Sequence, residues 1–246
     1  MTRPVVLVTG GSRGIGAALA RRLVDDGWHV VIGYRARSDA ADALVASLDG
    51  NATALAGDVA SETDVLRMFA ALDGKFGRLD ALVNNAGIVA PAMRVADMPA
   101  ERIERIFATN VLGSFYCARE AVRRMSTAHG GRGGSIVNVS SAAARLGAPN
   151  EYIDYAASKG AIDTMTIGLS KEVAAEDIRV NAVRPGLIET EIHASGGAPD
   201  RIERLAGTVP MQRGGTADEV AALIAWLLSA QASYVTGAIV DVSGGR

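Results

Sequence analysis

The stretch Thr9-Gly10-Gly11-Ser12-Arg13-Gly14-Ile15-Gly16 decides the fold of this chain. It follows the apolar residues 5–8, and after it apolar side chains recur at helical spacing. A glycine-rich turn between a buried strand and a helix lets backbone N–H groups and the helix N-terminus approach a pyrophosphate. The alternative is a turn that is glycine-rich for structural reasons alone. The residues expected to form a dinucleotide cradle are Gly10, Ser12, Arg13, Gly14, Ile15 and Gly16.

Strand-like and helix-like segments alternate along the whole chain. Short runs rich in β-branched residues occur at 5–9, 30–34, 79–84, 136–140, 180–183 and 239–242, with a weaker one at 53–56. Continuous apolar strands alternating with helices favour a parallel sheet covered on both faces, with right-handed crossovers. The sequence therefore predicts one α/β domain over 1–246, a Rossmann-type doubly wound parallel sheet of about seven strands. The irregular segment 189–216 is expected to be a substrate-binding lid.

Composition excludes several classes of function. The chain has 246 residues, 49% hydrophobic residues and a net charge of −2, which gives no electrostatic case for nucleic acid or an anionic membrane. A single cysteine fits a reducing compartment. No apolar run reaches the length of a membrane span, and the first residues leave no room for a signal peptide. We expect a soluble cytoplasmic protein that binds neither nucleic acid nor membrane.

The end of the second strand indicates which dinucleotide is bound. NAD sites usually carry Asp or Glu there, to bind the ribose 2′-hydroxyl. This chain instead has Tyr34 and Arg35, and Arg13 lies in the glycine turn. Guanidinium groups suit a 2′-phosphate, so the sequence favours NADP(H) over NAD(H) as the cofactor. The alternative is that Arg35 and Arg37 are solvated loop charges.

Polar residues at two further strand ends fit the same cleft. Asp58 and Val59 end the third strand, where a carboxylate can accept a hydrogen bond from adenine; Asp58 could also cap a helix. Asn84, Ala86 and Gly87 follow the fourth strand, beside the point where the strand order is expected to reverse. Ligands of such sheets bind at that point.

Tyr155 and Lys159 carry the predicted chemistry. Four residues apart on a helix, they share one face. A nearby ammonium lowers the pKa of a phenol and so makes tyrosine a usable acid or base. Lys159 is one of only three lysines, beside Lys75 and Lys171, in a chain that otherwise uses arginine. Tyr152, seven residues before Lys159, lies near the same face and remains an alternative to Tyr155. No metal site is expected.

With these motifs the chain resembles the short-chain dehydrogenase/reductase family over essentially its whole length. The motifs that match in order and approximate spacing are 9–16, 84–87, Asn110, Ser140-Ser141, 155–159 and the run from Pro185-Gly186 to Thr190. Within the family, the chain is similar to bacterial reductases of the 3-oxoacyl-carrier-protein reductase and glucose dehydrogenase types.

The resemblance implies a role for each matching residue. Tyr155 would be the general acid or base, and Ser141 would hydrogen-bond the reacting oxygen. Lys159 would bind the nicotinamide ribose and lower the pKa of Tyr155, and Asn110 would hold a water linking Lys159 to solvent. Residues expected near the nicotinamide are Pro185, Gly186, Ile188 and Thr190. Because Ser141 precedes Tyr155 by one residue more than in many relatives, Ser140 remains an alternative.

These observations predict an NADP(H)-dependent oxidoreductase that transfers a hydride between the nicotinamide and a small carbonyl or secondary alcohol. Two alternatives stay open: a sugar or alcohol dehydrogenase working in the oxidative direction, and a dinucleotide sensor without activity. Relatives pair the helices expected near 101–125 and 152–176, so we expect a homotetramer or dimer. The sequence leaves the substrate open, together with the roles of Tyr152, Arg145, Glu151 and His193.

Overall fold

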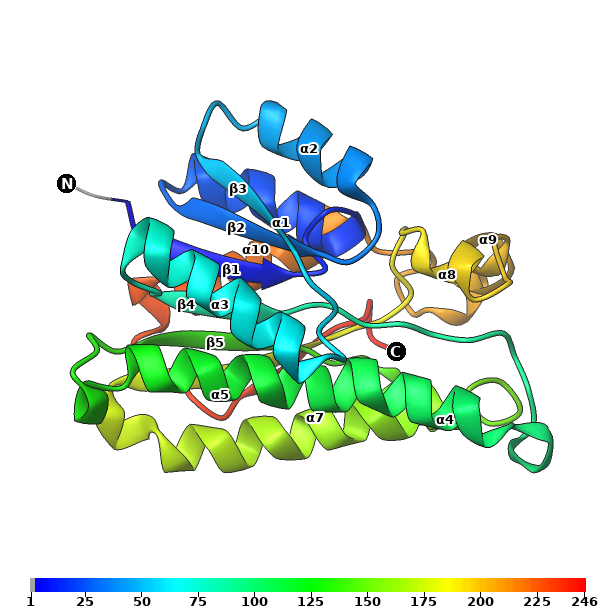
Figure 1. Ribbon diagram of the computed structural model, residues 1–246. Coiled ribbons are helices and arrows are strands. Elements are labelled where there is room, and N and C mark those ends of the chain that lie inside the picture. Colours follow the sequence, from blue (N-terminus) through cyan, green and yellow to red (C-terminus); the bar gives the residue numbers. More distant parts are fainter. Residues whose placement is uncertain (1–2) are drawn as a thin grey trace.

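A seven-stranded parallel sheet forms the centre of the computed structural model, which describes residues 3–246 (Figure 1). The strands are β1 (Val5–Thr9), β2 (His29–Tyr34), β3 (Ala52–Ala56), β4 (Ala81–Asn84), β5 (Gly134–Val139), β6 (Ile178–Pro185) and β7 (Ile239–Val242). The α-helices are α1 (Gly14–Asp25), α2 (Ser38–Ala46), α3 (Glu62–Phe76), α4 (Ala100–Phe107), α5 (Gly113–Met125), α6 (Ala143–Leu146), α7 (Ile153–Glu172), α8 (Ile192–Ser195), α9 (Arg201–Leu205) and α10 (Ala217–Leu228). The predicted doubly wound α/β architecture is confirmed, with strand ends that differ by at most two residues.

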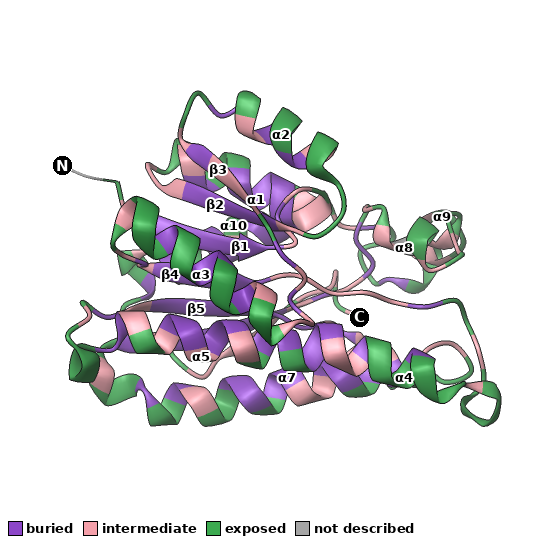
Figure 2. Cartoon of the chain, viewed as in Figure 1, coloured by how far each residue is buried: buried purple, intermediate pink, exposed green. Residues whose placement is uncertain are grey.

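Helices cover both faces of the sheet, and alternation along the strands separates two apolar layers. Val6 and Val8 of β1 belong to the layer packed under α1, α2 and α10. Val5 and Leu7 point to the opposite face, where α3, α5 and α7 pack. Figure 2 shows the strands as a buried band between these helices. Burial on both faces explains why a central strand such as β1 is almost continuously apolar in sequence.

The strand order is β3-β2-β1-β4-β5-β6-β7, so it reverses between β1 and β4. In this part of the sheet Leu7 is in register with Val31 on one side and Leu82 on the other. Connections leave β1 and β4 toward opposite faces, which opens a crevice at the carboxyl ends of these two strands.

The helical run 100–125 differs from the single helix expected near 101–125. Between α4 and α5 the five residues Ala108–Leu112 form a π-helical turn. Such a turn inserts an extra residue without breaking the helix, and it is frequent at functional sites. Asn110 lies within it, and its backbone carbonyl accepts a hydrogen bond from Ser114 Oγ at 3.0 Å. The second predicted helix, near 152–176, ends earlier as α7 and is followed by a 3₁₀ turn, Ala174–Glu176.

Candidate active site

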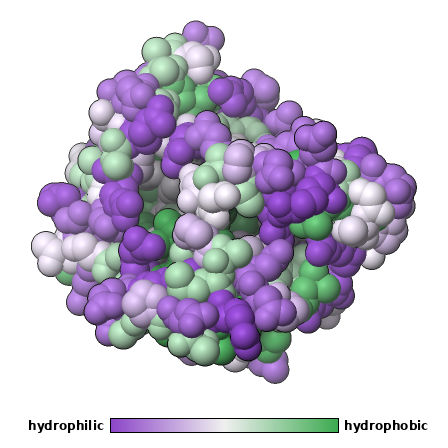
Figure 3. Space-filling view, turned by 90° about the vertical axis from the view of Figure 1, so that its right-hand side faces the viewer, coloured by the Kyte–Doolittle hydropathy of each residue, from purple (hydrophilic) through white to green (hydrophobic). Residues whose placement is uncertain are grey.

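A cavity of about 1050 Å³ lies at the carboxyl ends of the strands. Its walls come from the loops that follow β1, β2, β3, β4, β5 and β6, and from the segment that holds α8 and α9. Figure 3 views the molecule from this end, where hydrophilic side chains surround a recess that shows apolar side chains. The cavity therefore lies where the strand order predicts a ligand site.

The glycine turn after β1 forms one end of the cavity. Gly10 and Gly14 have φ of 60° and 50°, a region that favours glycine. A Cβ on Gly10 would lie 2.9 Å from the Cα of Ala86. Arg13 occupies the N-cap position of α1 and makes no side-chain cap hydrogen bond, and the first turn of α1 has no acidic residue. The N–H groups at this helix start are thus left to bind an anion, and the turn fits a dinucleotide pyrophosphate.

Two of the predicted cofactor-binding residues, Gly16 and Asn84, do not line the cavity. A Cβ on Gly16 would lie 2.6 Å from the carbonyl oxygen of Gly10, so Gly16 lets α1 pack against the turn but does not line the cavity. Asn84 is buried, and its Nδ2 donates to Asn138 Oδ1 at 2.9 Å. The next residue, Asn85, lines the cavity instead, and its Nδ2 donates to the carbonyl oxygens of Thr9 and Gly10. Sequence reasoning missed this role of Asn85, although the motif 84–87 contains it.

The end of β2 carries the predicted 2′-phosphate residues. Tyr34 and Arg35 both line the cavity, and Arg35 Nη1 lies 3.4 Å from Asp58 Oδ2. The side chain of Arg35 is 57% exposed, so this ion pair can exchange for a ligand phosphate. Asp58 is not the N-cap of α3; Ser61 is, and Asp58 Oδ1 accepts from the backbone N–H of Ala60. Arg13 is paired with Glu191 of the predicted lid at 2.7 Å.

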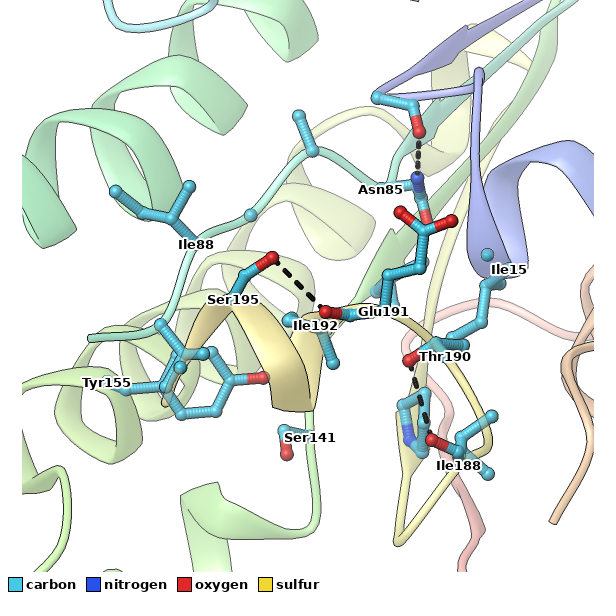
Figure 4. A pocket seen from close by; sticks show the side chains of 18 of the residues that line it. Ile15, Asn85, Ile88, Ser141, Tyr155, Ile188, Thr190, Glu191, Ile192 and Ser195 are labelled. Atoms are coloured by element: carbon cyan, nitrogen blue, oxygen red, sulfur yellow. Dashed lines mark hydrogen bonds between the residues drawn. The ribbon is translucent and has the colours of Figure 1, made fainter. Parts of the chain in front are cut away.

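The other predicted cofactor residues line the same cavity. They are Val59, Ala86, Gly87, Pro185, Gly186, Ile188 and Thr190. Ile188 and Thr190 reach it from the loop after β6, as Figure 4 shows. Loops distant in sequence thus meet along one continuous wall.

Tyr155, Ser141 and Lys159 meet near the centre of the cavity. The Tyr155 phenol and Ser141 face the same space beside α8 (Figure 4). Burial raises the pKa of Tyr155, and a hydrogen bond with Ser141 opposes this shift. Lys159 is buried, and its Nζ lies 5.7 Å from the centre of the Tyr155 ring. Burial lowers the pKa of Lys159 to about 8, although the carboxylate of Asp163 opposes this shift.

The expected effect of Lys159 on the pKa of Tyr155 stays a prediction. The pKa of Tyr155 is raised, and Lys159 is not among the groups that shift it. The physical reason is the direction of the ammonium, which donates to the carbonyl oxygen of Val139 at 2.7 Å. At neutral pH the phenol is therefore protonated.

The two candidate serines have different hydrogen bonds. Ser140 is buried, and its Oγ donates to the backbone carbonyl of Lys159 at 3.1 Å. Ser141 Oγ accepts from the backbone N–H of Ala143 at 3.1 Å, which leaves its own hydrogen for another partner. This arrangement favours Ser141 as the donor to a reacting oxygen.

Asn110 lies behind Gly87 and does not line the cavity. Its Oδ1 accepts from the backbone N–H of Ile88 at 2.8 Å, and its Nδ2 donates to Ser158 Oγ at 3.0 Å. A Cβ on Gly87 would lie 3.4 Å from Lys159 Nζ and 3.5 Å from Asn110 Oδ1. Gly87 thus keeps the space between these two groups free of a side chain.

Tyr152 is next to Tyr155 but in a different environment. The two rings make an edge-to-face contact, with centroids 5.7 Å apart. A hydrogen bond joins Tyr152 to Glu151, and burial raises the pKa of Tyr152 to about 12. Arg201 lies over the same ring, 5.1 Å from its centre. The phenol of Tyr152 already has a carboxylate partner, which favours Tyr155 as the reacting group.

Among the residues that the sequence left open, Glu151 lines the cavity and Arg145 does not. Arg145 instead pairs with Asp241 at 3.0 Å. The side chain of His193 lies outside the described part of the structure. Within residues 3–246, the side chain of His193 excepted, no group of three or more His, Cys, Asp and Glu side chains is placed to hold a metal ion. No helix in the same range is both long and apolar enough to cross a membrane.

Comparison with known proteins identifies the family. The family model described as enoyl-(acyl carrier protein) reductase matches residues 10–246. An uncharacterized oxidoreductase of Escherichia coli (strain K12), YgfF, is 55% identical over 245 residues, covering 98% of this chain and 99% of that protein. The chain belongs to the short-chain dehydrogenase/reductase family.

Solved structures of this family add information on the cofactor. A 3-ketoacyl-(acyl-carrier-protein) reductase from Brucella melitensis, complexed with NADH, is 33% identical, with a TM-score of 0.92 over 99% of this chain and 98% of that one. ElxO with NADP bound is 32% identical, with a TM-score of 0.89 and the same coverage of each chain. These neighbours support a nicotinamide dinucleotide as the cofactor of this short-chain oxidoreductase.

Proposed function

We propose that this short-chain oxidoreductase reduces the carbonyl group of a small molecule with NADPH, and that Tyr155 is the general acid. The observation that carries the proposal is the meeting of three groups in one cavity. The Tyr155 phenol, the Ser141 hydroxyl and the Lys159 ammonium lie there together, in the same cavity as the uncapped start of α1.

The bound cofactor would supply the hydride. Tyr155 would donate its proton to the substrate oxygen, and Ser141 would stabilise the charge that develops there by a hydrogen bond. Lys159, which lines the same cavity, would hold the ribose hydroxyls. A general acid must be protonated to act, and burial, which raises the pKa of Tyr155, favours its protonated form.

Two arginines support NADP(H) over NAD(H). Arg35 follows β2 directly, has an exchangeable partner in Asp58 and lines the cavity. Arg13 lies in the glycine turn and has Glu191 as its partner. Both side chains are about half exposed, so a 2′-phosphate can reach them at little desolvation cost.

The segment 189–216 fits a substrate-binding lid. Its helices α8 and α9 lie beyond the carboxyl ends of the strands (Figure 1). Ile192 and Ser195 of α8 stand beside the Tyr155 phenol (Figure 4). A small molecule bound between this segment and Tyr155 would be shielded from water.

NADPH oxidation against a panel of carbonyl compounds tests the proposal. The panel holds acetoacetyl thioesters, diketones, aldoses and cyclic ketones. We expect turnover of at least one class. Binding of NADPH without turnover of any compound would contradict the proposal and favour a dinucleotide sensor. Turnover of glucose or secondary alcohols with NADP⁺, without carbonyl reduction, would favour an oxidative dehydrogenase.

A further inference from the structure

Arg201 of α9 forms part of the cavity wall beside Tyr152. Its side chain is only 11% exposed, although it carries a full charge. Arg201 lies over the Tyr152 ring, 5.1 Å from its centre, and the same ring makes an edge-to-face contact with Tyr155. Arg201 and the proposed reacting group therefore contact the same aromatic side chain.

The guanidinium of Arg201 is already paired with a carboxylate, that of Glu151. Nη1 and Nη2 donate to the two oxygens of Glu151, at 3.1 Å and 2.7 Å. This two-pronged geometry is the one in which arginine recognises carboxylates best. The Glu151 side chain is 35% exposed, about three times as much as that of Arg201. Of the two partners, Glu151 is thus the one that can turn into water.

We propose that Arg201 binds a carboxylate group of the substrate, and that Glu151 fills this place when no substrate is bound. The inference rests on the proposed function and names its substrate class: carbonyl compounds that also carry a carboxylate. Leaving the mostly buried guanidinium without a counter-ion would be costly, so one carboxylate replaces another. Arg246 also lines the cavity and is close enough to Glu151 to lower its pKa, which adds positive charge at this end.

A purely structural role for the pair makes a different prediction. If the ion pair only held the lid against residue 151, removing either partner would loosen the lid. Both variants would then change ligand binding in the same direction. If Glu151 competes with the substrate, Arg201→Gln weakens carboxylate binding and Glu151→Gln strengthens it. The opposite signs separate the two roles.

Arg213 provides a matched control. It belongs to the same predicted lid segment and makes a two-pronged pair with Glu219, at 2.9 Å and 2.6 Å. Arg213 is not part of the cavity wall. Arg213→Gln therefore removes a similar ion pair from the segment without touching the proposed subsite.

The test measures binding of straight-chain oxo carboxylates of increasing length, and of their methyl esters, to the NADP⁺-loaded full chain by calorimetry. With the oxidised cofactor a carbonyl compound cannot be reduced, so binding is read without turnover. We expect at least one acid to bind about tenfold more tightly than its ester, and Arg201→Gln to abolish this preference. Glu151→Gln should tighten binding of the acid, and Arg213→Gln should leave the binding of acid and ester unchanged.

Equal binding of acids and esters to the wild-type chain would overturn the inference, as would changes of the same sign in Arg201→Gln and Glu151→Gln. The same pairs are then offered to the NADPH-loaded chain. Turnover of esters without preference for acids would contradict this inference and leave the proposed function standing. Acid-selective binding without turnover of any carbonyl compound would contradict the proposed function and leave the carboxylate site at Arg201 standing.

Discussion

At the scale of single residues, burial acts on Tyr155 and Lys159 in the same sense. It disfavours the charged form of each group, raising the pKa of the phenol and lowering that of the ammonium to about 8. The pair therefore carries a single positive charge at neutral pH and loses it in mildly alkaline solution. Charge on Lys159 would be restored by any ligand that brings negative charge close to it.

The lowered pKa of Lys159 predicts how stability depends on pH. An unfolded chain keeps the Lys159 proton up to about 10.5, and the folded chain releases it near 8. Between these values the unfolded state binds more protons, so the free energy of unfolding rises with pH. We expect wild type to gain up to about 1.4 kcal/mol per pH unit relative to Lys159→Met in this window. Urea unfolding of both chains without cofactor, from pH 7 to 10, measures it; a pH-independent difference would contradict it.

Arg35 is expected to set the cofactor preference. Its guanidinium lies at the cavity with a partner that a 2′-phosphate can replace. Arg35→Gln should lower kcat/KM for NADPH by about tenfold or more and leave that for NADH nearly unchanged, because only NADPH carries the extra phosphate. Steady-state kinetics with both cofactors decide this. A wild-type preference for NADH would contradict the assignment of NADP(H).

At the scale of elements, the contact between α1 and the glycine turn allows no side chain at Gly16. A Cβ there would lie 2.6 Å from the carbonyl of Gly10 and 2.8 Å from Asn85 Nδ2. Gly16→Ala should therefore cost about 1–3 kcal/mol of stability and weaken dinucleotide binding. Gly74 within α3 has open space around it, and Gly74→Ala should stabilise by about 0.5–1 kcal/mol. Thermal unfolding and dinucleotide titration measure both variants; equal effects would contradict this reading of the turn.

The elements were largely predictable from sequence, and their local irregularities were not. Buried parallel strands such as β1 and β2 contain apolar runs that stand out between amphipathic segments. The π-helical turn at Ala108–Leu112 leaves no such signal, because a single wide turn barely changes the spacing of apolar residues. Side-chain direction at strand ends was also beyond prediction: of two adjacent asparagines, Asn84 turns into the core and Asn85 toward the glycine turn.

At the scale of the whole molecule, contacts between distant segments complete the site. Most of the motifs that resemble those of the family lie at strand ends, and Tyr155 and Lys159 lie on α7, so their convergence follows from the fold. The ion pair between Glu151 and Arg201 joins residues 50 positions apart through an irregular segment, and neither position belongs to a recognisable motif. The sequence left the role of Glu151 open, and no pattern in it indicated Arg201 as the partner.

Self-association is expected through the outer surface of α5 and α7. Both helices pack on the same face of the sheet. Each exposes a large apolar side chain, Phe115 at 48% and Ile167 at 42%. A second copy of the chain could cover such side chains. We expect a dimer or tetramer in light scattering, and Phe115→Glu should shift it to smaller species without changing the circular dichroism. A monomeric wild-type chain would contradict this expectation.

The central claim is that Tyr155 delivers the proton, and one comparison tests it most directly. Single-turnover oxidation of bound NADPH by a carbonyl substrate is measured for wild type, Tyr155→Phe and Tyr152→Phe. Removing a general acid should slow the reaction by about 10²- to 10⁴-fold, with NADPH affinity retained. Tyr152→Phe should keep a rate much closer to that of wild type. A Tyr155→Phe chain that reacts at the wild-type rate would contradict the proposed mechanism.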